Sequence, residues 1–323
     1  MVKKHRKDWG QTTADMFDYM RSGSFAMDRD AKRERSSMTK FFHLIRKLDK
    51  HMGNERHVFC DKYAFKKLIE ENGIKVPETY ATLRKEKDWD VFWDKVSQYD
   101  TFVMKPNRLS EGRGIHVLTR GEENWFEISG EAVAIATLMK DAIGFLRRRT
   151  TAHRDGQKVR NIVIAEERVF SHEDFDEFTV DGGIVDFRMY MLDDEVLYGK
   201  MRCPTNKSGG LGNTAKGAIA LFVEKGIISD GKEIFKNTTS RYNGVDMAGR
   251  EVPFWKEIKE CSENVSKIFK SPFHSVDLTI GKDGKATVME CEKIPTLDHF
   301  KKPEADRLYE VLEEWAQEKL WRE

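Results

Sequence analysis

A chain of 323 residues is long enough to bury a sizeable core in two or three packed lobes. Its 56 basic and 55 acidic side chains nearly cancel, so the net field favours neither nucleic acid nor an anionic membrane as a partner. No run of about 18 apolar residues occurs, and residues 1–30 lack an apolar leader core, so neither a membrane span nor a signal peptide is expected. The 4 cysteines are widely spaced without a CxxC pair, which disfavours disulfides and zinc and fits a cytoplasmic location.

The pattern of residues 1–58 predicts a helical extension without strands. Residues 13–25 and 37–51 carry apolar side chains at helical spacing. Residues 2–35 are also rich in lysine and arginine, which fits either a solvated arm or a docking surface for an acidic partner.

The following part of the chain is predicted to mix helices with a hairpin. In chain order the elements are a helix at 60–72, an extended segment at 74–83, a helix at 89–99, strands at 101–105 and 115–118, a helix at 132–149 and a strand at 161–166. The first helix ends at an Asn-Gly pair. The last strand is apolar throughout, which predicts burial on both of its faces.

The second half of the chain is predicted to hold two more hairpins. In chain order the elements are strands at 184–191 and 195–202, a loop at 206–217, a helix at 253–269, strands at 274–280 and 286–290, and a closing helix at 303–321. The last hairpin turns at an Asp-Gly pair, a strong short-range signal. Because strands do not alternate regularly with helices, the predicted fold class is α+β rather than a doubly wound sheet.

Three acidic side chains near the C-terminus form the strongest chemical signal. Glu290 and Glu292 are two positions apart on one predicted strand, so both point to the same face. The turn at Asp283-Gly284 places Asp277 across from the Glu290 end. Carboxylates this close raise each other's pKa unless a cation lies between them, and hard oxygen ligands suit Mg²⁺ or Mn²⁺. The alternative is a hairpin that exposes its acidic face to solvent.

A lysine at the end of an apolar strand is the second signal. Lys105 ends the run at 101–105, and a loop with Gly112, Arg113 and Gly114 follows. Glycines let the backbone approach a phosphate closely, and the arginine adds a planar fork of donors. The pattern therefore indicates an anion-binding strand and loop, with a hairpin turn bearing surface charges as the alternative.

Six short segments form a further, ordered signal. They lie at residues 61–62, 72–77, 103–106 with 112–115, 164–167, 186–188, and 277 with 290–292. Each is weak alone, and their shared order makes the set specific. In that order the chain resembles the ATP-grasp superfamily from residue 58 to about residue 300. The resemblance is greatest to the glutamate-ligase-like and sugar-transfer-associated groups, whose sequences are similar to residues 243–255.

The resemblance implies two α+β lobes that clamp ATP between them. The small lobe would span residues 59–165 and the C-terminal lobe, with the metal site, residues 166–323, behind the helical extension at residues 1–58. Position by position, the resemblance also implies a set of nucleotide contacts. They are Lys62 and Lys105 at the phosphates, Arg113 and Gly114 in the closing loop, Glu166 at the adenine amino group, the backbone of Glu167 and Val169 at the adenine edge, and Glu173 or Asp174 at the ribose.

For the reacting groups, the resemblance implies that Arg188 and Arg202 face the γ-phosphate and the acyl phosphate. Asp277, Glu290 and Glu292 match the family's metal ligands for Mg²⁺, with Mn²⁺ as an alternative. The chain departs from the family in two ways. The family's last metal position is often asparagine, and many members carry a Rossmann-like domain where this chain has about 60 predicted helical residues, so the acceptor site is expected elsewhere.

The function implied is an ATP-dependent carboxylate–amine ligase that forms an amide through an acyl phosphate. The substrates would be an amino acid, a peptide or an aminosugar, with no nucleic acid or membrane partner, and the oligomeric state is left open. The loop at 206–217 is predicted to be a lid that brings Asn213 and Lys216 to the phosphate, with a plain surface loop as the alternative. Two other functions remain open: a kinase acting on a hydroxyl, and a non-catalytic nucleotide-binding module.

Overall fold

The computed structural model describes the chain from residue 40 to residue 320, with gaps. The described residues are 40–41, 43–44, 47–48, 50–52, 56–109, 112–148, 153–154, 157–158, 160–180, 182–293, 295 and 299–320. The chain divides into two compact units, Met1–His43 and Leu44–Glu323. The basic arm and the helix predicted at 13–25 lie outside the described residues, whereas the described residues between 40 and 52 are helical, as predicted.

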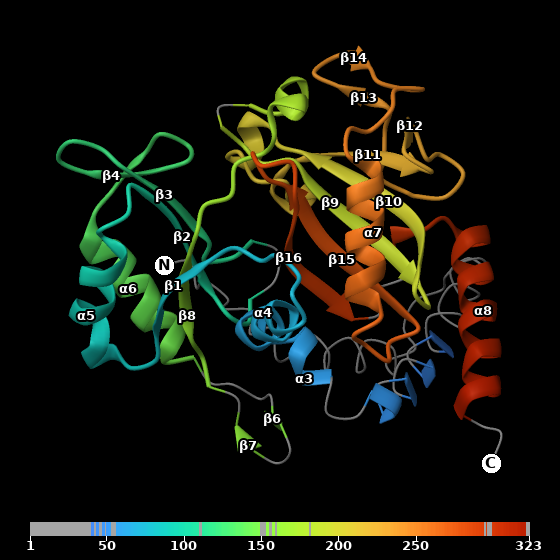
Figure 1. Ribbon diagram of the computed structural model, residues 1–323, viewed down its shortest axis with the longest axis horizontal. Helices are drawn as coiled ribbons and strands as arrows, with labels where there is room; N and C mark the ends of the chain where they lie inside the picture. The colour runs from blue at the N-terminus through green and yellow to red at the C-terminus, as the bar shows by residue number, and fades with distance from the viewer. Residues whose placement is uncertain are drawn as a thin grey trace, which may run out of the picture. The chain divides into compact units, whose positions relative to one another are not determined.

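The first sheet has six strands in the order β1-β8-β2-β3-β4-β5, and all its neighbours are antiparallel. The strands are β1 (Thr79–Leu83), β2 (Thr101–Pro106), β3 (His116–Arg120), β4 (Trp125–Glu127), β5 (Ala132–Val133) and β8 (Val163–Glu166). Helices α5 (Trp89–Val96) and α6 (Ile135–Leu146) lie side by side against this sheet (Figure 1) and bury Trp89, Phe92 and Leu138 in its core.

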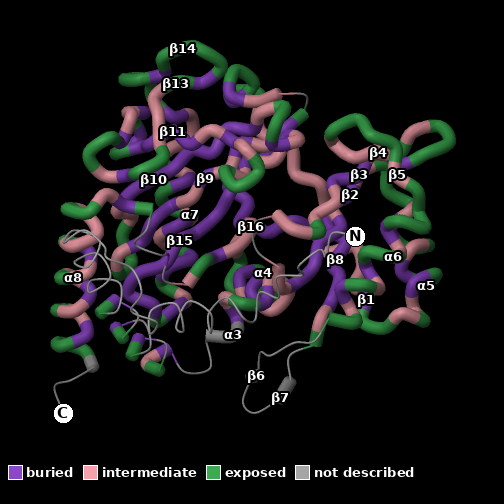
Figure 2. Tube along the Cα trace, turned by 180° about the vertical axis from the view of Figure 1, so that it is seen from behind, coloured by how far each residue is buried: buried purple, intermediate pink, exposed green. Residues whose placement is uncertain are grey.

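The second sheet also has six antiparallel strands, in the order β12-β11-β10-β9-β15-β16. They are β9 (Asp186–Leu192), β10 (Glu195–Cys203), β11 (Ile219–Glu224), β12 (Ile227–Ser229), β15 (Phe273–Ile280) and β16 (Ala286–Lys293). Every residue of β15 is buried, and β9, β10 and β15 form the buried centre of this sheet (Figure 2). Helix α7 (Trp255–Ser266) packs on one face, and α8 (Lys302–Leu320) closes the described chain.

Several short elements lie between the longer helices and strands. The short helices are α3 (Arg56–Phe59), η2 (Glu86–Asp88), η3 (Glu173–Phe178), η4 (Asn206–Ser208) and η5 (Thr214–Lys216). The two-residue strands are β6 (His153–Arg154), β7 (Gln157–Lys158), β13 (Arg241–Tyr242) and β14 (Val245–Asp246). Among the described residues, no helix combines the length and the apolar character that crossing a membrane requires.

The three predicted hairpins are confirmed as β2–β3, β9–β10 and β15–β16. The helix predicted at 132–149 is too long, because Ala132–Val133 pairs with β4 and the helix begins only at Ile135. Strands β4, β11 and β12 were not predicted. The loop predicted at 206–217 contains the two single turns η4 and η5, each ended by a glycine in the left-handed region.

Helix α4 (Lys62–Glu71) connects the two sheets and begins at a well-formed cap. The Asp61 carboxylate accepts hydrogen bonds from the N–H groups of Tyr63 and Ala64 at 3.0 and 3.3 Å. Phe65 and Ile69 on one side of the helix bury in the core of the second sheet. Lys66 on another side reaches a strand of the first sheet. The cap therefore fixes the start of the helix that positions side chains toward both sheets.

Replacing Asp61 with alanine should lower the free energy of unfolding by about 1 kcal/mol, because two N–H groups lose their acceptor. Chemical denaturation measures the change. Asp88 offers a matched control, because it caps α5 without a side-chain hydrogen bond. Asp88→Ala should therefore leave the unfolding midpoint almost unchanged, and equal losses in the two variants would contradict the assigned cap.

His274 of β15 gives the fold a predictable response to pH. Its ring is fully buried against Phe59 and Phe269, and its Nδ1 lies 3.1 Å from the Ser271 carbonyl oxygen. Burial lowers the pKa of His274 to about 4, although the Ser271 carbonyl acts in the other direction. Because the pKa is lower in the folded chain than in the unfolded one, the stabilisation is complete above about pH 6.5 and is lost as the pH falls toward 4.

Between about pH 7 and pH 4, the wild type should lose on the order of 2 kcal/mol more unfolding free energy than His274→Gln. Denaturant unfolding at a series of pH values measures both slopes, and nuclear magnetic resonance titration of the ring gives the pKa directly. An ordinary titration of the His274 ring near pH 6.5 would show this interpretation to be wrong.

Candidate functional site

One row of side chains crosses the second sheet from an aromatic end to an acidic end. The register pairs Phe222 with Lys200, Lys200 with Arg188, Arg188 with Asp277 and Asp277 with Glu290. Paired residues in antiparallel strands point to the same face, so five strands supply one continuous row. The row confirms the predicted position of Asp277 across from Glu290. A bulge after Asp277 leaves Met289 without a partner in β15.

Arginines hold the acidic part of this face. The Arg188 guanidinium donates to both oxygens of Asp277, at 2.8 and 2.7 Å, and to Glu292 at 2.9 Å. Arg202 lies two positions along β10 from Lys200. It donates to Asp277 at 2.7 Å and forms a second, very short contact with Asp186. The predicted pair Arg188 and Arg202 therefore converges on one buried carboxylate.

The electrostatics of these carboxylates differ although they share a face. Burial raises the pKa of Asp277, but Arg188 and Arg202 hold it well below its ordinary value. Burial raises the pKa of Asp186 to about 7, and the charge of Asp277 adds to this while Arg202 opposes it. Burial also raises the pKa of Glu292 against the effect of Arg188. The ionised form is therefore disfavoured at Asp186 and Glu292 but favoured at Asp277 on the same face.

Lys62 links the two sheets at the acidic end of the row. Its Nζ donates to the Leu109 carbonyl at 3.0 Å and lies 2.5 Å from a Glu290 carboxylate oxygen. Burial raises the pKa of Glu290, but the neighbouring Lys62 holds it below its ordinary value. Lys62 thus brings the first turn of α4 and the segment after β2 to the acidic strand β16.

Lys105 and Glu166 form a second ionic cluster, on the first sheet. Glu166 is fully buried and forms ion pairs with Lys105 and with Lys66, whose Nζ lies 2.9 Å from the carboxylate. Burial raises the pKa of Glu166, but the two lysines hold it below its ordinary value. Burial lowers the pKa of Lys66 against the effect of Glu166. The Glu166 carboxylate is thus paired with two lysines. Its contact with adenine stays a prediction.

The glycine loop after β2 meets the predicted lid. Gly112 and Gly114 adopt positive φ values of 67° and 70°, which non-glycine residues rarely do. A Cβ at Gly112 would lie 3.1 Å from Asn213 Nδ2 and 3.6 Å from Lys216 Cε. The carboxamide oxygen of Asn213 accepts from the Ala215 N–H and caps η5. The structure therefore brings the closing loop and the lid residues together.

The remaining predicted contacts lie along the segment that follows β8. The Glu167 N–H donates to the Glu78 carbonyl at 2.8 Å, while Val169 is half-buried. Glu173 and Asp174 are exposed at the start of η3, where the Asp174 N–H donates to the His172 ring. Their roles at adenine and ribose stay predictions.

The predicted metal ligands supply hard carboxylate oxygens on one face. Among the described residues, no three acidic, histidine or cysteine side chains are gathered as a ready-made metal site. Asp277, Glu290 and Glu292 are instead neutralised by Arg188 and Lys62. This donor set suits Mg²⁺ by its chemistry.

A buried carboxylate oxygen on the same face also supports a cation site. Within the described part of the chain, Asp186 Oδ1 is buried without a hydrogen-bond partner. Like-charge repulsion among Asp186, Asp277 and Glu290 also disfavours the ionised carboxylates. A divalent cation would give Asp186 Oδ1 a partner and would reduce the repulsion among these carboxylates. The residues present therefore fit a divalent cation.

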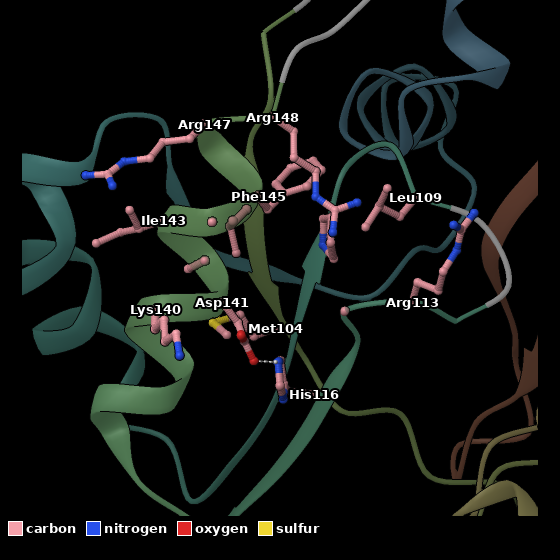
Figure 3. A pocket seen from close by; sticks show the side chains of 15 residues that line it. Met104, Leu109, Arg113, His116, Lys140, Asp141, Ile143, Phe145, Arg147 and Arg148 are labelled. Atoms are coloured by element: carbon pink, nitrogen blue, oxygen red, sulfur yellow. Dashed lines mark ion pairs between the residues drawn. The ribbon is translucent and has the colours of Figure 1, made fainter. Parts of the chain in front are cut away.

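A hollow of ≈ 730 Å³ lies on the other side of the first sheet. Met104 and Pro106 line it, and because side chains alternate along β2, Lys105 points to the opposite face. Figure 3 shows His116 and Asp141 paired at the hollow, 3.5 Å apart, with Arg113 at its edge. The hollow is therefore separate from the face of Lys105 and Glu166.

Three residues of these clusters were missing from the predicted site. Lys66 sits on an amphipathic helix, where a lysine is usually solvent-exposed. Asp186 lies two positions before Arg188, and Lys200 lies two positions before Arg202, so strand alternation placed both on the functional face. That spacing was the available signal. Lys66 offered none, because its partner Glu166 is 100 positions away.

The family follows from a comparison of the sequence with family models. Residues 44–315 match the model described as sugar-transfer associated ATP-grasp. The mixed α+β fold with two antiparallel sheets is thus of ATP-grasp type. The chain belongs to the sugar-transfer associated ATP-grasp family. No curated protein sequence matches the chain at a significant level.

A search of solved structures matches this chain to several ligases and synthetases that share little sequence with it. D-alanine–D-alanine ligase from Bacillus anthracis, complexed with ATP, is 15% identical with a TM-score of 0.49, covering 83% of this chain and 68% of that one. D-cycloserine synthetase is 14% identical with a TM-score of 0.45, covering 79% and 71%. L-amino acid ligase from Bacillus licheniformis is 12% identical with a TM-score of 0.43, covering 75% and 44%.

Proposed function

We propose that the protein is an ATP-dependent carboxylate–amine ligase that forms an amide through an acyl phosphate, on an amino acid, a peptide or an aminosugar. The observation that carries the proposal is the continuous row on the second sheet. It places Arg188 beside Asp277 and Glu290, and Lys62 joins it from α4. Membership of the ATP-grasp family supports the same reading.

The nucleotide phosphates are proposed to bind Lys62 and Lys105. Each lysine now has a carboxylate partner, Glu290 and Glu166 respectively. A polyphosphate offers more negative charge than one carboxylate, so it competes for both ammonium groups. The loop with Arg113 and Gly114 would close over the phosphates, and the adenine and ribose would lie along the segment from Glu166 to Glu173.

Magnesium is proposed to be held by Asp277, Glu290 and Glu292, with Mn²⁺ as an alternative ion. The ion would neutralise phosphate charge and so favour phosphoryl transfer. Because Glu292 stands where the family often has asparagine, the site carries one more negative charge. Arg188 already binds Glu292, which balances that charge in the structure.

The reaction would proceed in two balanced steps. A substrate carboxylate oxygen attacks the γ-phosphorus, the bond to the bridging oxygen breaks, and ADP leaves with that electron pair. An amine then attacks the carbonyl carbon, the C–O bond to phosphate breaks, and the amine proton passes to solvent. Arg188 and Arg202 would align and stabilise the transferring phosphoryl group, and the lid would bring Asn213 and Lys216 to the phosphate.

An ADP-release screen tests the proposal. Amino acids and peptides serve as carboxylates, crossed with amines, in the presence of Mg²⁺. A ligase releases ADP continuously only when a carboxylate and an amine are both present, and mass spectrometry shows a product lighter than their sum by one water. Release with an alcohol alone, giving a stable phosphoester, would show a kinase instead.

A further inference from the structure

Lys200 is a buried cation without an acidic partner in the described part of the chain. Only 8% of the residue is exposed, and its ammonium group makes no hydrogen bond or ion pair there. Its Nζ lies 3.7 Å from the centre of the Phe235 ring and 5.5 Å from that of Tyr190. Aromatic faces attract a cation, but they do not replace the hydration that it lost on burial.

Two neighbours of Lys200 in the sheet are themselves positive. Arg188 on β9 is its direct cross-strand partner, and Arg202 lies two positions along β10 on the same face. Those two arginines are neutralised by Asp277, Asp186 and Glu292, whereas Lys200 is not. Burial, together with the charges of the two arginines, lowers the pKa of Lys200 to about 7. An anion from outside the chain would offset both effects.

We propose that Lys200 binds a second anionic group of the substrate, a carboxylate or phosphoryl oxygen next to the acyl phosphate that Arg188 and Arg202 align. The inference rests on the proposed function, because the proposed function places the acyl phosphate, and so the activated carboxyl group, at the arginines. The protein is therefore selective for acidic substrates. Residues directly opposite in a sheet have Cβ atoms roughly 5 Å apart, which suits the two carboxylates of a short diacid.

The aromatic side chains around Lys200 shape this subsite. Phe235 packs against Tyr190 and against Phe300, with ring centres 5.4 and 4.7 Å apart. The Tyr190 hydroxyl lies 3.4 Å from a ring nitrogen of His299. These rings exclude water from the ammonium group, and an ion pair formed in such surroundings is stronger than one in solvent. The acidic group of the substrate would therefore form a strong ion pair with Lys200.

Calorimetric titration tests the inference without requiring turnover. Glutarate, its monoamide and inorganic phosphate are each titrated into protein saturated with Mg²⁺ and a non-hydrolysable ATP analogue. The wild type should bind glutarate or phosphate at least about tenfold more tightly than the monoamide. Lys200→Met should abolish that preference, and Lys200→Arg should retain part of it. Lys256→Met is the matched control, because its side chain is 87% exposed on α7.

The titrations distinguish a carboxylate from a phosphoryl group in the subsite. They also distinguish failure of this inference from failure of the ligase proposal. A preference for glutarate assigns a carboxylate to the subsite, and one for phosphate assigns a phosphoryl group. Unchanged selectivity in Lys200→Met, or binding of none of the probes to the wild type, would overturn the inference. Loss of affinity for the ATP analogue in Lys200→Met would overturn it too, because Lys200 would then serve the nucleotide. The ligase proposal stands or falls separately, on ADP release.

Discussion

Replacing Glu290 with glutamine should lower ATP turnover about 10²–10³-fold while the chain remains folded. Glu290 lies at the acidic end of the row on the second sheet, where it forms an ion pair with Lys62 of α4. The amide keeps the size of the side chain and can still accept from Lys62, but it removes the charge proposed to hold Mg²⁺. The loss should therefore appear in the chemical step, measured as ADP release with the substrate pair identified by the screen.

The control for this variant is Glu260→Gln on α7, an exposed glutamate that forms an ion pair with Lys256. It should keep wild-type turnover. Thermal unfolding should be nearly the same for both variants and the wild type. Full turnover in Glu290→Gln would remove the metal assignment, and an unfolded variant would show that Glu290 acts in stability instead.

Replacing Glu166 with glutamine should lower the free energy of unfolding by about 3–5 kcal/mol. The carboxylate lies between Lys66 and Lys105, and all three side chains are at most 8% exposed. Its removal leaves two buried ammonium groups without a counter-charge, which is the costly way to break a buried ion pair. Urea unfolding measures the change.

Two other variants calibrate this loss. Lys66→Met should cost much less, because Glu166 keeps Lys105 as its partner and one buried charge is removed. Glu86→Gln breaks an ion pair with Arg147 on the surface and should leave the unfolding midpoint almost unchanged. If Glu166→Gln is no more destabilising than Glu86→Gln, the buried cluster does not stabilise the fold as argued.

The sequence predicted the hairpins well because their signals are local. The Asp283-Gly284 turn and the runs of apolar residues on either side define β15 and β16 without reference to the rest of the chain. Short strands were missed for the opposite reason. β4 and β12 have three residues each, too few to show a period, and they are strands because β4 pairs with β3 and β5 and β12 pairs with β11.

The site was predictable where chemistry and spacing coincide. Glu290 and Glu292 share a face by alternation, and the register confirms Asp277 opposite Glu290. Which side chains neutralise which charges was not predictable, because Lys62 and Lys66 meet their partners only after the two sheets assemble around α4. A buried lysine such as Lys200 also has the same sequence signal as an exposed one.

The transfer of oxygen from the substrate to phosphate tests the central claim most directly. The identified carboxylate is labelled with heavy oxygen and converted with ATP, Mg²⁺ and the amine, and the inorganic phosphate is analysed by mass spectrometry. Activation through an acyl phosphate predicts one labelled oxygen in the phosphate for each amide formed. Unlabelled phosphate alongside the amide would contradict the account, because the carboxylate oxygen would then never have been bonded to phosphorus.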